Sequence, residues 1–164
     1  MKRQQGAELP EFAVVGAVFF MILFFVLELG RVVFAWETLV EATRRGARIA
    51  AVCPFNHGAI EELTVSGDPD GDGYTLYGLS TADVSVAYLN EAGGAVGDPV
   101  ANPTDVFFVR VRITGYRHQF IVPLLAGFID APTFETVLPT ESLGAVPTPE
   151  GEATIDSQCY GATI

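Results

Sequence analysis

Three aspartates in one short acidic turn are the clearest candidates for metal chemistry in this sequence. Asp68, Asp70 and Asp72 stand at positions 1, 3 and 5 of a loop of the EF-hand kind, with Gly73 at position 6. Position 12 of such a loop is Leu79 instead of the bidentate glutamate, and no clear helix pattern flanks the segment. Two interpretations stay open: a calcium loop and a solvated Asp/Gly hairpin.

Other chemistry-bearing residues are sparse. His57 and His118 stand far apart in the chain, and we expect no zinc site from them. The sequence contains no G-x-S-x-G, H-E-x-x-H, P-loop or G-x-G-x-x-G motif. We therefore expect no enzyme activity and no cofactor apart from the calcium alternative.

The charge balance excludes one large class of partners. The 164 residues are 49% hydrophobic and carry 20 Asp and Glu against 9 Lys and Arg, a net charge of −11. The apolar content excludes disorder, and the acidity excludes general nucleic-acid binding, which needs a basic face. Most of the excess acid lies beyond residue 48, so an apolar, nearly neutral segment precedes an acidic body.

A membrane segment is expected near the N-terminus. Phe12 to Leu27 contains no charge, and at 1.5 Å per residue it covers about 24 Å of the ~30 Å hydrocarbon core. The apolar run continues to residue 34, interrupted by Glu28 and Arg31, which can pair three residues apart. No small-x-small cleavage site follows it directly. We expect an uncleaved anchor over about 12–34; a removed signal peptide and a buried core helix are the alternatives.

The helix pattern continues beyond the membrane segment. We expect one helix from about Pro10 to Val52, because Pro10 suits a first turn and Pro54 forbids continuation beyond Cys53. Glu41 and Arg45 stand at the spacing of a favourable ion pair. The apolar stripe of its second half contains Val32, Trp36, Leu39, Thr43, Gly46, Ala50 and Cys53, and the opposite side contains Glu37, Glu41, Arg44 and Arg48. Small residues at Ala42, Gly46 and Ala50 would let another surface approach closely; simple packing of the helix on the sheet is the plainer interpretation.

Residues 54–164 read as a β-rich globular domain. The clearest strand is 106–114, in which apolar side chains alternate with Arg110, Arg112 and Thr114. The further strand candidates are 60–66, 74–79, 83–89 and 133–138; a turn and short helix are expected over 120–129, and a loop over 144–151. The sequence thus predicts an α+β fold with a long helix packed across a small antiparallel sheet.

The first 53 residues resemble a known family. Residues 6–12 (GAELPEF) place a glutamate five residues after a glycine, directly before an aromatic and an apolar helix, as in Flp-type and other type IV prepilins. Glu28–Arg31 and Ala42–Arg48 are similar to the E-x-G-R and A-x-x-x-G-A-R segments of TadE-like minor pseudopilins of tight-adherence pilus systems. The resemblance implies a type IV pilin-like fold and a structural role in pilus assembly, with other pilins and the assembly machinery as partners.

The same resemblance implies a maturation step. A prepilin peptidase would remove a leader of residues 1–6 by cutting between Gly6 and Ala7, so that the mature helix region is 7–53. Glu11, followed by Phe12, would then pair at the membrane edge with the new terminal amine of a neighbouring subunit. Glu11 resting among lipid headgroups, with no such role, is the alternative.

The two cysteines bear on the compartment. Cys53 and Cys159 stand at opposite ends of the acidic body. An acidic domain behind a membrane segment favours an oxidising compartment and hence a Cys53–Cys159 disulfide; two reduced thiols are the alternative.

We expect a single-pass protein of the bacterial inner membrane, N-terminus in the cytoplasm and the body outside it, with incorporation into the extracellular pilus left open. A membrane-anchored binding module that uses calcium is the second functional hypothesis.

Overall fold

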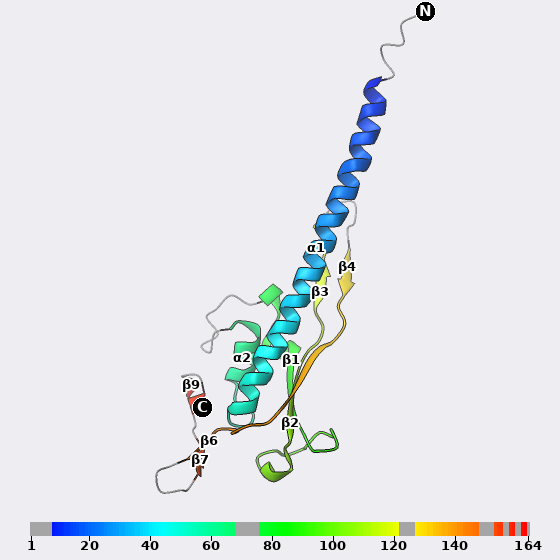
Figure 1. Cartoon of the computed structure of the whole chain (residues 1–164). Coiled ribbons are helices and arrows are strands. Elements are labelled where there is room, and N and C mark those ends of the chain that lie inside the picture. The colour runs from blue at the N-terminus through cyan, green and yellow to red at the C-terminus, as the bar shows by residue number, and fades with distance from the viewer. Residues whose placement is uncertain are drawn as a thin grey trace, which may run out of the picture.

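A single long helix organises the molecule. The computed structural model describes residues 8–67, 76–121, 127–147, 153–155, 158–159 and 162–163. Helix α1 runs unbroken from Glu8 to Val52, with Pro10 in its first turn and Pro54 just beyond its end. All the other labelled elements lie along its C-terminal half, and its N-terminal half extends away from them (Figure 1). The expected helix is confirmed.

The second half of α1 packs by one face. Every residue of the predicted apolar stripe is buried except Trp36, which is half-buried, and Glu37, Glu41, Arg44 and Arg48 are exposed. Trp36 packs against the ring of Phe134, with the ring centroids 6.5 Å apart. The expected pair of Glu41 with Arg45 is wrong: Glu41 lies 3.5 Å from Arg44, and the Arg45 side chain is directed elsewhere.

The sheet that α1 covers has three antiparallel strands. These are β1 (Val84–Leu89), β2 (Phe108–Ile113) and β5 (Phe134–Pro139), in the order β1-β2-β5. The central strand β2 alternates as predicted: Val109, Val111 and Ile113 are fully buried, and the residues between them are half-exposed. The α+β fold and the strands expected over 83–89, 106–114 and 133–138 are confirmed.

The strand expected over 60–66 is wrong, because these residues form helix α2 (Ala59–Val65). Ile60, Leu63 and Thr64 recur at helical spacing and are buried, so the segment places one face on α1. Arg45 of α1 donates from Nε to the Leu63 carbonyl at 2.8 Å and from Nη2 to the Thr64 carbonyl at 2.9 Å. The Leu63 carbonyl also accepts from the backbone N–H of Gly67 at 3.1 Å, so Arg45 adds a second donor there and supplies one to Thr64 at the end of this short helix.

Several smaller elements also differ from expectation. Leu76–Gly78, in the strand expected over 74–79, is a turn of 3₁₀ helix, as are Thr81–Asp83 and Pro103–Asp105. The turn and short helix expected over 120–129 is wrong at its end, where β4 (Phe128–Asp130) pairs with β3 (Arg117–Gln119). The loop expected over 144–151 contains β6 (Ala145–Pro147), which pairs with β7 (Ala153–Ile155). Strands β8 (Gln158–Cys159) and β9 (Ala162–Thr163) form a further short pair.

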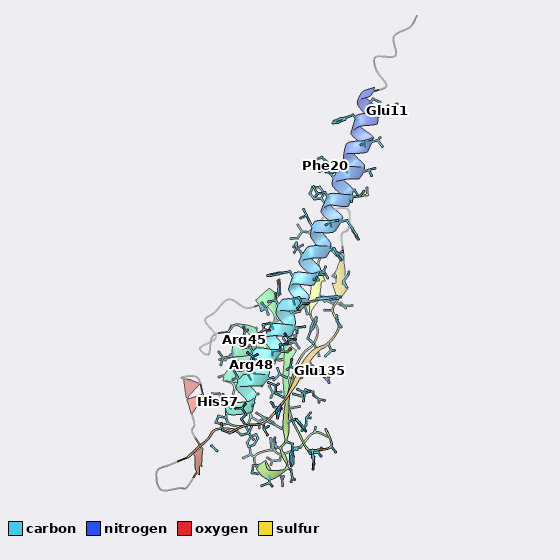
Figure 2. All side chains as sticks on the ribbon, viewed as in Figure 1. Glu11, Phe20, Arg45, Arg48, His57 and Glu135 are labelled. Carbon is cyan, nitrogen blue, oxygen red and sulfur yellow. The ribbon has the colours of Figure 1, made fainter. Side chains whose placement is uncertain are left out.

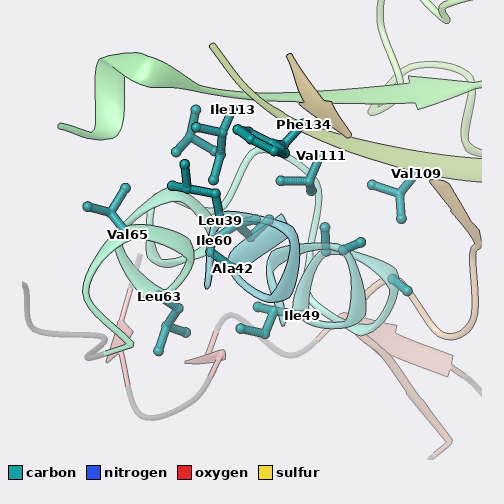
Figure 3. Packing of buried hydrophobic residues seen from close by; sticks show 14 of the residues in the cluster. Leu39, Ala42, Ile49, Ile60, Leu63, Val65, Val109, Val111, Ile113 and Phe134 are labelled. Carbon is teal, nitrogen blue, oxygen red and sulfur yellow. The ribbon is translucent and has the colours of Figure 1, made fainter. Parts of the chain in front are cut away.

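The core lies where α1, α2 and the sheet meet (Figure 3). Gly46 is the point of closest approach: a Cβ placed there would lie 2.1 Å from Thr64 Oγ1 and 3.1 Å from Val111 Cγ1. The small residues of α1 therefore let both α2 and the sheet approach its backbone, and the packing interpretation of Gly46 is confirmed.

Candidate functional site

The N-terminal half of α1 presents apolar side chains around its whole circumference. Large apolar side chains are exposed all along this half, among them Phe19 and Phe24, and Phe20 points outward from it (Figure 2). The helix is long and apolar enough to cross a membrane, and the most apolar part of it is scarcely buried.

The residues with an expected role in maturation and assembly lie at the start of this helix. Glu11 and Phe12 are both exposed, and Glu11 lies near the end of α1 remote from the body (Figure 2). Among the described residues, Glu11 makes no ion pair. Gly6 and Ala7 lie outside the described residues, so cleavage between them stays a prediction.

A buried carboxylate lies at the boundary between the exposed half and the packed half of α1. Glu28 is only 3% exposed, although neighbours on both sides of it on α1 are exposed apolar residues. Arg31 Nη1 donates a hydrogen bond to Glu28 Oε1, as the sequence spacing predicts. From the hairpin β3–β4, His118 Nε2 lies 3.3 Å from Oε1, and the backbone N–H of Ile121 donates to Oε2 at 3.4 Å. Partners therefore surround this carboxylate on both oxygens, as burial of a charge requires.

Tyr116 extends the cluster away from Glu28. Its hydroxyl lies 3.1 Å from His118 Nδ1, and both side chains are buried. A neutral His118 satisfies both contacts if the Tyr116 hydroxyl donates to Nδ1 and the Nε2–H donates to Glu28. Burial raises the pKa of Tyr116, Tyr77 adds to the rise, and Arg31 opposes it. The hydroxyl therefore stays protonated and able to donate at neutral pH.

The ring contacts continue along the same strand. Tyr77 and Tyr116 have ring centroids 5.7 Å apart, Tyr116 and His118 6.3 Å, and His118 and Phe120 5.9 Å. These ring contacts join the 3₁₀ turn at Tyr77 to the hairpin, and the contact of His118 with Glu28 joins the hairpin to α1. The cluster offers no site for a reacting substrate, because its polar atoms are already paired with one another.

Sequence reasoning missed this use of His118. Two signals could have found it. Tyr116, His118 and Phe120 alternate at strand spacing, and Glu28 interrupts an apolar run that needs an additional partner for a carboxylate.

The remaining site residues are divided between described and undescribed regions. Cys53 is buried at the end of α1. Cys159 belongs to β8, but its side chain is outside the described set, so the disulfide stays a prediction. Asp68, Asp70 and Asp72 also lie outside the described residues. In the described ranges, no three His, Cys, Asp or Glu side chains gather as a metal site would require.

An open hollow of about 690 Å³ lies beside the connection from β1 to β2. Glu91, Asp105 and Phe107 contribute to its lining, and none of its lining residues is basic. This hollow lacks the convergent, buried polar groups of a small-molecule site.

Comparison with known proteins bears on α1 alone. Residues 6–48 match a family model described as TadE-like protein. No curated protein and no solved structure matches the chain. The matched segment contains Glu11, the Glu28–Arg31 pair and the close-packed Gly46, and it ends just before α1 does. Over residues 6–48 the chain is thus similar to TadE-like proteins.

Proposed function

We propose that this protein is a minor pseudopilin, a membrane-anchored structural subunit that takes part in the assembly of a tight-adherence pilus. One observation carries the proposal: the TadE-like segment coincides with a helix whose first half is apolar and exposed and whose second half packs on an α+β body. The first half suits lipid or the helices of other pilins, and the second half presents the body at a fixed position. The role is structural and not catalytic.

The proposal includes processing by a prepilin peptidase. Cutting between Gly6 and Ala7 would remove the basic residues Lys2 and Arg3 and create a new amino terminus close to the start of α1. A glycine before the bond lets the extended backbone lie close to the peptidase, and a β-branched residue there would not.

Intact mass spectrometry of the protein from its native membrane tests this step. The expected mass begins at Ala7 in cells with an active prepilin peptidase, and Gly6→Val should retain Met1. Gly16→Val is the matched control, because Gly16 lies inside α1 with open space around its Cα and should not alter processing. A wild-type protein that keeps Met1 in such cells would contradict the proposed processing.

The proposed location is the bacterial inner membrane, with the N-terminus in the cytoplasm and the body on the other side. Support comes from the apolar half of α1 and the acidic composition of the body. Protease added to spheroplasts should digest the body and leave the membrane helix intact. Protection of the body in intact spheroplasts, with digestion only after lysis, would place it in the cytoplasm instead.

A further inference from the structure

The hairpin β3–β4 exposes apolar side chains on both of its faces. Ile121 is 70% exposed, Phe128 58% and Ile129 43%. Ile129 pairs across the hairpin with His118 and shares its face, whereas Phe128 pairs with Gln119 and lies on the opposite face. The Phe128 face also carries Arg117, Gln119 and Asp130, so the exposed apolar side chains gather at the end of the hairpin nearer Ile121. Exposed apolar side chains gathered in this way indicate a surface that contacts something other than water.

The apolar residues lie at the level where α1 enters the body. The backbone N–H of Ile121 contacts the Glu28 carboxylate, and β3 and β4 run beside the middle of α1 (Figure 1). Leu29, Val33 and Phe34, which follow Glu28 on α1, are also exposed. Exposed apolar side chains of α1 and of the hairpin therefore lie at the same level along the helix.

The length of the charge-free segment places the membrane boundary near this level. Residues 12–27 cover about 24 Å, short of the ~30 Å hydrocarbon core. With Glu11 near one boundary, the other falls about four residues beyond Leu27, at Arg31. Glu28 then lies just inside that boundary, where its partners Arg31 and His118 lower the cost of burying it.

We propose that the hairpin β3–β4 inserts Ile121, Phe128 and Ile129 into the lipid at the boundary of the leaflet through which α1 leaves the membrane. The proposal rests on the membrane anchorage included in the proposed function. Lipid is the occupant because the exposed apolar side chains of the hairpin lie at the level of Glu28, where the candidate membrane span of α1 nears its end.

The charges of the hairpin fit that placement. Arg117 lies over the Phe128 ring at 4.3 Å from the centroid and pairs with Asp130 at 2.8 Å. A guanidinium above an aromatic ring can stay among headgroups while the ring reaches the acyl chains. The charged end of the hairpin thus remains on the aqueous side, and its apolar end faces the membrane.

Tryptophan fluorescence of the full chain in phosphatidylcholine vesicles tests the insertion. Trp36, the single tryptophan, is first replaced by Phe, which keeps an aromatic ring against Phe134. Phe128→Trp and Ile121→Trp then report the hairpin. Phe20→Trp reports the membrane helix. Phe107→Trp is the exposed control, because Phe107 comes just before the first residue of β2, at the end of that strand away from the hairpin. The quencher is phosphatidylcholine brominated near the glycerol end of its acyl chains.

The two hairpin variants should emit to the blue of the Phe107→Trp control and lose about half of their intensity to the brominated lipid, because interfacial insertion reaches ~5–10 Å into the boundary. The control itself should lose little intensity. If Phe20→Trp is quenched but neither hairpin variant is quenched more than the control, the insertion is wrong and the anchorage stands. If Phe20→Trp is not quenched either, both fail. Should Phe128→Trp not fold, Ile121→Trp decides the matter.

Discussion

His118 Nε2 lies 3.3 Å from Glu28 Oε1, across 90 positions of sequence. This contact joins a short hairpin to the middle of α1 at the only carboxylate inside the apolar run. Because Tyr116 contacts the other ring nitrogen, His118 links a buried hydroxyl to a buried carboxylate. Loss of the imidazole leaves two buried polar groups without one of their partners.

Replacing His118 by Ala should therefore loosen the hairpin. We expect a loss of about 1–3 kcal/mol in the free energy of unfolding and faster hydrogen exchange at the amides of β3 and β4. Arg117→Ala is the control on the same strand, since its exposed ion pair should contribute under about 1 kcal/mol. A double-mutant cycle with Glu28→Ala should give a coupling above about 0.5 kcal/mol. Additive effects would show that the two side chains do not act together.

Gly46→Ala should destabilise the body, because the added methyl group meets Thr64 and Val111 at the closest approach of α1. Overpacking of this kind costs about 1–3 kcal/mol. Gly30→Ala is the matched helical control: its site is open, so it should be neutral or gain up to about 1 kcal/mol. Thermal unfolding in detergent measures both. Equal midpoints for the two variants would mean that α2 moves aside at no cost.

Glu61 makes stability depend on pH. Burial raises the pKa of Glu61 above its ordinary 4.5, and the neighbouring Glu62 adds to the rise, while a backbone hydrogen bond and His57 oppose it. The folded state thus holds this proton more tightly than the unfolded state. The free energy of unfolding therefore falls as the pH rises from 4.5 through the raised pKa, and the loss persists at neutral pH.

Glu61→Gln should remove this dependence and raise the unfolding midpoint at neutral pH. The control is Glu37→Gln, an exposed carboxylate on α1. Midpoints recorded between about pH 4 and 8 separate the two, because only Glu61→Gln should flatten the profile. A flat wild-type profile over this range would contradict the assignment to Glu61.

The Cys53–Cys159 disulfide has its own test. Non-reducing peptide mapping should recover a crosslinked peptide, and reductant should lower the unfolding midpoint. Closing a loop of roughly 100 residues stabilises by at most ~4.7 kcal/mol in the chain-entropy model. Cys159→Ala should unfold at the lower midpoint with or without reductant. Alkylation of both cysteines in the folded wild type without reductant would show two thiols instead.

Glu11→Ala tests the assembly role of the first helical turns. The variant should still enter the membrane, because α1 keeps its apolar surface, but should crosslink poorly to neighbouring pilus subunits. Glu37→Ala, an exposed carboxylate farther along α1, is the control and should crosslink as the wild type does. Unchanged crosslinking in Glu11→Ala would leave its carboxylate without an assembly role.

Periodicity in the sequence predicted the long helix and the central strand. It failed where a tertiary contact determined the local structure. The stripe along α1 and the alternation in β2 were readable because each repeats over several turns or residues. The segment at Ile60 reads as a strand from its short apolar run, but docking against Gly46 selects the helix. Similarly, Arg45 does not pair with Glu41, because it donates to two carbonyls at the end of α2 instead.

Sequence patterns could mark His118 as a strand residue and Glu28 as a carboxylate that needs a partner, but they could not pair the two. Glu28 is distant from His118 in sequence, and only the three-dimensional path of β3 brings the imidazole to that carboxylate. Local sequence shows that Glu28 needs compensation and that Arg31 can provide part of it, but not which other element completes the pairing.

The unbroken course of α1 has a mechanical consequence. A helix of 45 residues extends about 68 Å, and no proline or other break interrupts it after its first turn. Because the helix has no hinge, a rotation or shift of its apolar end also moves the sheet that is packed on its other end. Neighbouring subunits that contact only the exposed half of α1 would therefore also fix how the body is rotated about the helix axis.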